Sequence, residues 1–283
     1  MSKEGVSATD STPGKVRTTT SRTWAPTPLP PGRGCLTIAS TDAATRPLKT
    51  AETVARDVVH DIVRDDLRTG SSLPSEVAML EQYGVSRESL REGLRLLEAQ
   101  GLITIRRGPG GGPVVGQVDP ANLGRISTLY YHLAGATYAE LFDAWVLTEA
   151  TLAELAARNP DRRRVREALK PLVDHDGDDE TDVESFVVMH TNFHAAVASL
   201  AGNRVLELTL QTMGRIVTHH IVVNADPRDA RSTIAHDHRD IARAVISGHA
   251  HKARDLMGEH VHAVAEVYRS QIGDQMGDLI EWK

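Results

Sequence analysis

Cysteine is almost absent from this sequence, since Cys35 is the only one in 283 residues. A single cysteine cannot form an internal disulfide, which excludes a disulfide-stabilised scaffold and suits a reducing compartment. No apolar run approaches the roughly 20 residues that a membrane-spanning helix needs, and the first 50 residues contain no apolar secretory core. We therefore expect a cytoplasmic protein without a membrane partner.

Aromatic residues are also few, and the chain has no overall excess of positive charge. Only 4% of the residues are aromatic, while Ala, Val and Leu are plentiful, a composition that favours helices. The net charge of −6 divides into +4 over residues 1–50, −2 over 51–117 and −8 over 118–283. The acidity therefore lies mainly in the C-terminal part and does not exclude a basic surface in the middle of the chain.

Residues 73–101 predict two short helices joined by a tight turn. A serine caps the start of each helix and a glycine ends it, namely Ser75 and Gly84 for the first helix, Ser86 and Gly101 for the second. Apolar residues recur at helical spacing in both, at Val77, Leu80 and Tyr83, then at Leu90, Leu94 and Leu97. A strand at 102–106, a basic tip and a return strand at 114–115 follow.

The first turn of the second helix is polar. Hydroxyl and guanidinium groups there can donate to phosphates and base edges from a helix N-terminus in a major groove. The alternative is a solvated helical hairpin with surface arginines. The polar residues at this first turn are Ser86, Arg87, Glu88, Ser89 and Arg91.

This segment resembles the winged helix-turn-helix of GntR-family transcription regulators, in its LPSE, VSR, LRE and EAQGLI pieces. The resemblance covers residues 50–117 and implies three helices, a two-stranded wing and a double-stranded DNA operator as partner. Val77 and Glu88 depart from the family, where an arginine and a small hydroxyl residue are frequent, so the operator sequence cannot be borrowed from relatives. The implied DNA contacts are Ser86, Arg87, Ser89 and Arg91 on the recognition helix, with Arg107 and Gly108 at the wing tip.

From Asp119 onward the sequence shows only helical periodicity, broken by Gly or Pro, which predicts an antiparallel all-α bundle. The acidic run from His175 to Asp182 is interpreted as a solvated loop and not as a calcium site, because no glutamate closes it at the twelfth loop position. The predicted helices span residues 119–134, 137–158, 161–174, 181–201, 203–224, 228–247 and 250–272.

Four histidines of this bundle lie on apolar helix faces. His190 and His194 are four residues apart and therefore share a face, together with Phe186, Val187, Phe193 and Val197. His238 and His260 lie 11 residues on either side of His249, so an antiparallel hairpin that turns there brings them to the same height. His236 and His262 are also symmetric about the turn but fall among charged residues, and we discount them.

Four converging neutral imidazoles can hold a divalent transition metal, with zinc expected and nickel, copper, iron or manganese also compatible. Taken singly, each histidine could instead be a hydrogen-bonded core residue. The HxxxH, DHRDI and MGEHV pieces are similar to the metal-binding, FCD-type ligand-binding domain of the FadR subfamily, over residues 119–273. That resemblance implies ligands at His194, His238 and His260, whereas relatives typically have Asp at the position of His190.

A second departure concerns the effector. Relatives that bind small carboxylates usually have an arginine four residues before the position of Glu149, and here Trp145 stands there. We expect Trp145 to line the effector cavity and to suit a larger or more apolar ligand. A core or interface aromatic is the alternative.

These patterns predict a mainly α protein that is not an enzyme: a disordered tail over 1–49, a winged helix-turn-helix domain over 50–117, an all-helical effector, metal-binding and dimerisation domain over 118–275, and a C-terminal tail over 276–283. We expect a homodimeric repressor whose operator binding responds to a small, anionic effector, such as an organic acid, at the metal site. The alternatives are a regulator that senses metal alone and a metallohydrolase. We expect no inward-facing Glu or Asp beside the histidines, so a hydrolase would lack a general base.

Overall fold

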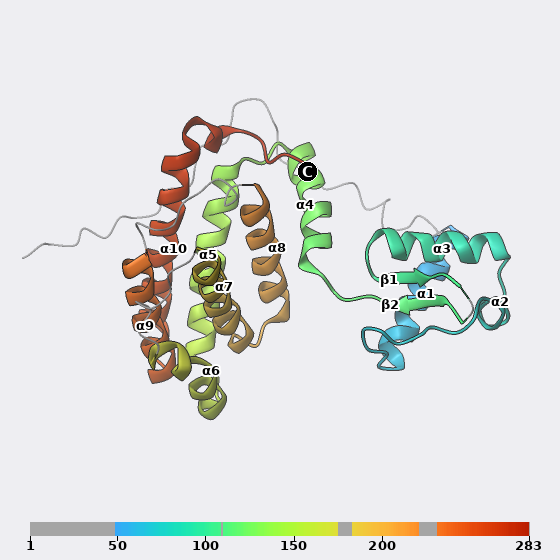
Figure 1. Cartoon of the computed structure of the whole chain (residues 1–283), viewed down its shortest axis with the longest axis horizontal. Helices are drawn as coiled ribbons and strands as arrows, with labels where there is room; N and C mark the ends of the chain where they lie inside the picture. Colours follow the sequence, from blue (N-terminus) through green and yellow to red (C-terminus); the bar gives the residue numbers. More distant parts are fainter. Residues whose placement is uncertain (1–48, 109, 175–182, 221–230, 283) are drawn as a thin grey trace, which may run out of the picture.

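The computed structural model describes residues 49–108, 110–174, 183–220 and 231–282. It shows a small domain with a two-stranded hairpin and a helical bundle, joined by the chain between β2 and α4 (Figure 1). The tail predicted over 1–49, apart from Lys49, lies outside the described residues, as do Cys35 and the loop at 175–182.

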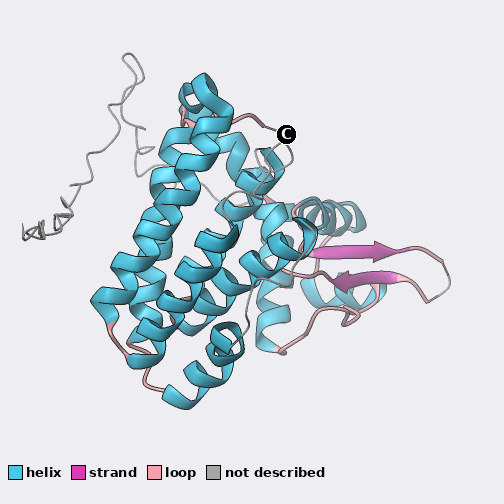
Figure 2. Cartoon of the chain, turned by 60° about the vertical axis from the view of Figure 1, so that its left-hand side comes forward, coloured by secondary structure: helices cyan, strands magenta, loops and turns pink. Residues whose placement is uncertain are grey.

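The N-terminal domain has the predicted order of three helices and a hairpin. The strands pair antiparallel, with Ile103 opposite Val115 and Arg106 opposite Gly112, and the hairpin, here called the wing, extends away from the helices (Figure 2). The elements are α1 (Thr50–Arg64), α2 (Glu76–Tyr83), α3 (Arg87–Ala99), β1 (Ile103–Arg106) and β2 (Gly112–Val115).

The capping residues behave as the sequence predicts. The Ser75 hydroxyl accepts from the Ala78 N–H (3.3 Å), and the Ser86 hydroxyl accepts from the Ser89 N–H (3.2 Å). Gly84 ends α2 in the left-handed region, at φ 62°. These caps fix where α3 begins and therefore which of its side chains lie at the open N-terminal turn.

One interior assignment in α2 is wrong. Val77, which we expect on the apolar stripe, is 61% exposed, and the buried residue of α2 is Met79. At about 100° per residue, Met79 lies about 200° around the helix from Val77. Helix α2 has only eight residues. The few apolar residues in so short a helix do not determine which of its faces is buried, and the position of the cap does.

The C-terminal domain is the predicted helical bundle. A short 3₁₀ turn at Gly273–Gly277 follows the last helix, and none of the helices within the described residues is long and apolar enough to cross a membrane. The helices are α4 (Pro120–Ala134), α5 (Tyr138–Ala157), α6 (Arg162–Asp174), α7 (Val183–Leu200), α8 (Arg204–His220), α9 (Arg231–Ser247) and α10 (Ala250–Ile272).

Helix α5 lies in the middle of the bundle and packs against α7, α8, α9 and α10 (Figure 1). Phe142 and Leu152 of this helix are fully buried. A side chain on the same stripe of α5 therefore points into the space that α7, α9 and α10 enclose, and Glu149 occupies such a position with 2% exposure.

The segment we expect to be a C-terminal tail packs against the junction of α4 and α5. Ile280 is 1% exposed, its N–H donates to the Ala136 carbonyl (2.9 Å), and its own carbonyl lies 3.0 Å from His132 Nδ1. A single buried isoleucine has no periodicity, so sequence pattern alone does not place it.

Candidate functional site

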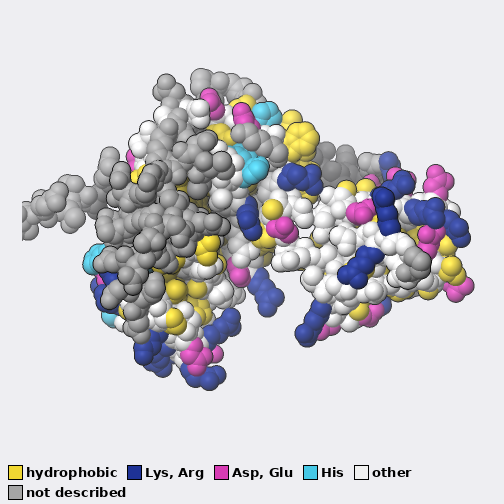
Figure 3. Space-filling view, in the orientation of Figure 1, with side chains coloured by type: hydrophobic (Ala, Val, Ile, Leu, Met, Phe, Trp, Pro, Cys, Tyr) yellow, Lys and Arg dark blue, Asp and Glu magenta, His cyan; other side chains and the backbone are white. Residues whose placement is uncertain are grey.

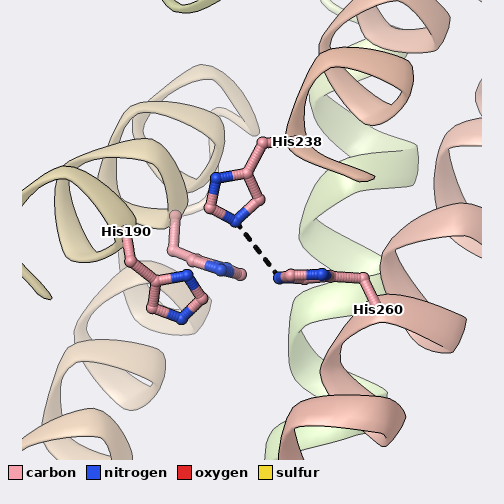
Figure 4. A group of neighbouring side chains, drawn as sticks. His190, His238 and His260 are labelled. Carbon is pink, nitrogen blue, oxygen red and sulfur yellow. Dashed lines mark hydrogen bonds between the residues drawn. The ribbon is translucent and has the colours of Figure 1, made fainter. Parts of the chain in front are cut away.

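The structure brings together the four histidines that the sequence singles out. His190 and His194 come from α7, His238 from α9 and His260 from α10, and one nitrogen of each lies within 4.8 Å of those of the others. Figure 4 shows the rings of His190, His238 and His260 pointing toward one another. Three of these residues are buried and His190 is partly buried. We call this group the histidine cluster.

The two hairpin histidines meet as the symmetry about His249 predicts. His238 Nε2 lies 3.2 Å from His260 Nε2. The other symmetric pair lies outside the cluster, because the His236 and His262 side chains are 65% and 50% exposed and face carboxylates of their own helices.

The apolar surroundings of the α7 histidines agree with the predicted face where they are described. Phe193 and Val197 are buried, and the Phe193 ring stacks on His238 at 3.9 Å between centroids. The side chains of Phe186 and Val187 lie outside the described part of the chain.

His260 is oriented by a carboxylate on the neighbouring helix. Its Nδ1 lies 3.2 Å from Asp237 Oδ2. A carboxylate accepts, so Nδ1 carries the hydrogen and the lone pair of Nε2 is left facing the cluster. Histidine ligands of metal ions commonly have such an outer carboxylate, which fixes the ring and raises its basicity. Sequence analysis missed Asp237.

Glu149 is the second carboxylate that sequence analysis missed, and our expectation of no inward-facing Glu or Asp is wrong. Its Oε1 lies 2.9 Å from His194 Nδ1 and accepts from Trp145 Nε1 (3.2 Å). Its Oε2 is buried and makes no hydrogen bond within the described residues. The signal was present, because Phe142, Trp145 and Glu149 follow at helical spacing on the buried stripe of α5.

Burial determines the charge state of the site. It raises the pKa of Glu149 to about 8, and it lowers the pKa of His190, His194 and His238 below the usual 6.5, with neighbouring imidazoles adding to the effect. These imidazoles are therefore neutral at pH 7. Neutral imidazole is the form that binds a metal.

The donor set fits a transition-metal ion. With Zn–N bonds of 2.0–2.1 Å, two nitrogens of a tetrahedral site are about 3.3 Å apart, and the two hairpin nitrogens are 3.2 Å apart. His194 Nε2 is buried and has no hydrogen-bond partner within the described residues, which a coordinated ion would supply. Imidazole nitrogen also suits nickel, copper and iron.

Trp145 lies beside this site and not on an exposed face. Its side chain is 8% exposed, its ring packs against Phe142 (5.8 Å between centroids), and its N–H binds Glu149. The residue therefore contacts the cluster through Glu149. Its role in lining an effector cavity stays a prediction.

The predicted DNA-reading turn is exposed at the start of α3, and its arginines are held by a carboxylate. Arg87 Nε and Arg91 Nη2 each lie 3.2 Å from Glu76 Oε1, with 63% and 57% of the arginine side chains exposed. The Ser86 and Ser89 hydroxyls lie 3.0 Å apart and bind each other. Sequence analysis did not anticipate that Glu76 of the LPSE piece would hold both arginines.

At the wing tip, Arg107 and Gly108 are exposed as the sequence predicts. Gly108 has φ 101°, in the region that favours glycine because a Cβ would be strained there. The tip therefore carries a cation on a tight turn that a bulkier residue would distort.

Comparison with known proteins agrees with both domains. Residues 50–111 match the family described as bacterial regulatory proteins, gntR family, and residues 140–263 match the FCD domain family. The first match implies DNA binding, and the second implies binding of a small-molecule effector.

A Glc operon transcriptional activator of Escherichia coli is 27% identical to this chain, over 62% of the chain and 70% of the relative. The HTH-type transcriptional repressor NanR of an Enterobacter species is 26% identical, over 56% of the chain and 62% of the relative. The solved structure of Streptococcus agalactiae GntR shows the same fold, with a TM-score of 0.58 and 24% identity, covering 76% of this chain and 99% of that one. The relatives are transcription regulators and not enzymes, and this chain belongs to the gntR family as a regulator with an FCD domain.

Proposed function

We propose that this regulator is a repressor that binds a pseudo-palindromic operator as a homodimer, and that a small anionic effector at a metal site in the bundle controls it. The observation that carries the proposal is the buried histidine cluster in the same chain as a capped recognition helix and a wing. Matched relatives include an activator and a repressor. We propose repression because a protein that covers its operator can exclude the polymerase without a further contact.

The DNA-contacting residues we propose lie on two exposed segments of the N-terminal domain. The start of α3 contributes side chains for base edges and phosphates, and the wing tip contributes a cation for the backbone. Their exposure and the serine cap that fixes the phase of α3 support this assignment. The residues are Ser86, Arg87, Ser89, Arg91, Arg107 and Gly108.

Replacing Arg87 or Arg91 by alanine should weaken operator binding by about 1 to 3 kcal/mol if the arginine binds a guanine through two hydrogen bonds. Fluorescence anisotropy with an operator selected from random duplexes measures the change, and circular dichroism checks that helix content is unchanged. The matched control is Arg166→Ala, an exposed arginine of α6 in the C-terminal bundle. Wild-type affinity in the Arg87→Ala, Arg91→Ala double variant would refute the recognition helix.

In the bundle, His190, His194, His238 and His260 would hold the metal, and Asp237 would orient the His260 ring. Glu149 lies against His194. A bound divalent ion would supply positive charge for an anionic effector. Relatives typically have Asp at the position of His190. Because histidine is neutral, it would not reduce the positive charge of the bound ion.

Trp145→Arg should increase the affinity for small carboxylates by about 10- to 100-fold, because a charge-assisted hydrogen bond is worth about 1.5 to 3 kcal/mol. Thermal shift of zinc-loaded protein with citrate or malate measures the change, and light scattering follows the oligomeric state. The control Trp145→Phe keeps an aromatic ring and loses the N–H that binds Glu149. A variant that becomes monomeric without a change in ligand range would assign Trp145 to the dimer interface.

An apolar face of α4 supports the homodimer. Leu123, Tyr130 and Leu133 lie on one side of this helix and are 39%, 69% and 71% exposed. Helix α4 directly follows the wing in the chain, so a second copy bound there would set the spacing of the two recognition helices. An effector that changes the packing of α4 would then change operator affinity.

Sensing of metal alone is the second candidate, and the close approach of the His238 and His260 rings favours it, because the cluster is compact without a further ligand. Titration of operator binding with zinc alone, and then with zinc plus small organic acids, separates the two. A full response to zinc alone assigns the metal as the signal, whereas a response that needs the acid supports the organic effector.

A further inference from the structure

A cleft of about 620 Å³ lies between α3 and the wing in the N-terminal domain. Arg91 and Arg95 line it from α3, Arg106 lines it from β1, and the Gly110 to Gly112 backbone lines it from the wing. The cleft shares Arg91 with the residues proposed to read DNA, whereas Arg95 and Arg106 lie outside that set.

The arginines of this cleft differ in their partners. Arg91 is held by Glu76, which also lines the cleft. Arg95 and Arg106 are exposed, and among the described residues neither has a carboxylate within ion-pair distance. The nearby Glu98 carboxylate accepts from the Ile105 N–H. The cleft therefore contains two arginines that form no ion pair within the described residues. They belong to a domain whose visible face carries Lys and Arg side chains among Asp and Glu side chains (Figure 3).

The walls of the cleft allow a close approach of a bulky group. A side chain added at Gly110 or Gly112 would meet nothing within 4 Å, whereas one added at Gly111 would meet the Arg106 carbonyl oxygen. The wing side of the cleft is therefore open at Gly110 and Gly112. A backbone without side chains is the usual means by which a protein lets a phosphate approach closely.

The position of the cleft identifies its occupant. The middle of α3, at Arg91 and Arg95, lines one side of it, and the wing lines the other. Two neighbouring grooves of a duplex are separated by one sugar-phosphate strand. We propose that the cleft binds the sugar-phosphate backbone of one DNA strand, with Arg95 and Arg106 as phosphate contacts. This inference rests on the proposed DNA-binding function and adds two residues that are absent from the recognition helix turn and the wing tip.

Phosphate contacts position a protein on DNA without specifying sequence, and each neutralised phosphate adds about 0.9 to the slope of log affinity against log salt. The probe is a random-sequence duplex, titrated into the full chain between roughly 50 and 200 mM salt. We expect Arg95→Ala and Arg106→Ala each to reduce the slope by about 0.9 and the double variant by about 1.8. Arg95→Lys and Arg106→Lys should keep most of the slope, because the charge remains.

Arg166→Ala on α6 is the matched control, since it removes one exposed charge from the C-terminal bundle and should leave the slope unchanged. An unchanged slope in the Arg95→Ala, Arg106→Ala double variant overturns the inference while leaving the recognition helix intact. A loss confined to one DNA sequence also overturns it, because that result indicates a base contact. A wild-type protein without salt-dependent binding to the duplex would refute the proposed DNA-binding function itself.

Discussion

His238→Ala and His260→Ala should each reduce zinc affinity by more than about 100-fold, since loss of an outer-shell partner alone typically costs 10- to 100-fold. Each substitution removes one imidazole from a compact buried site and leaves a cavity where its nitrogen stood. Wild-type protein loaded with zinc and desalted should retain about one ion per chain. Elemental analysis gives the stoichiometry and competition with a chromogenic chelator gives the affinity.

The chain offers a matched control on the same two helices. His236→Ala and His262→Ala remove the same residue type from α9 and α10, at side chains that are 65% and 50% exposed and lie outside the cluster. They should leave zinc binding near wild type, and chelation should lower the melting temperature of wild type but not of His238→Ala, because an ion that binds only the folded state stabilises it. Equal zinc loss from all four variants would show that the inward histidines are core residues.

The histidine cluster shows what a sequence can predict. Antiparallel helices joined by a short turn keep their register, so the equal spacing of His238 and His260 from His249 was enough to bring the two rings together. The caps at Ser75 and Ser86 were predictable for a related reason, since a cap depends only on the next three residues.

Contacts between elements that no short turn connects were harder to predict. Glu149 was visible on the apolar stripe of α5, but its contact with His194 depends on how α5 packs against α7. Asp237 lies next to His238 in the chain and binds His260 on the other helix, a reach that depends on the crossing of α9 and α10. Periodicity gives the face of each helix and leaves helix crossing undetermined.

We expect the buried titratable groups of this site to make the metal-free protein most stable near pH 6.5. His190, His194 and His238 have pKa values lowered by burial, so the folded protein keeps them neutral while the unfolded chain protonates them below 6.5. Their contribution to stability is present above pH 6.5 and is lost as the pH falls through that value.

Glu149 acts in the opposite direction. Burial raises its pKa from 4.5 to about 8, so in this range the folded protein holds a proton that the unfolded chain releases, and the stability this proton provides is lost as the pH rises toward 8. At about 1.4 kcal/mol per proton and pH unit, the four groups together should lower the free energy of unfolding by about 2.7 kcal/mol per unit below pH 6.5 and by about 1.4 kcal/mol per unit above it.

Glu149→Gln separates the two contributions, because it keeps the shape of the side chain and removes the titration. Urea denaturation in the presence of a chelator, from about pH 5 to 8, should show no fall above pH 6.5 in this variant and an acid-side fall that steepens to about 4 kcal/mol per unit. Glu259→Gln, at an exposed glutamate of α10, should follow the wild-type curve. If the Glu149→Gln and wild-type curves are parallel through pH 8, Glu149 is ionised in the folded protein over this range and burial does not raise its pKa.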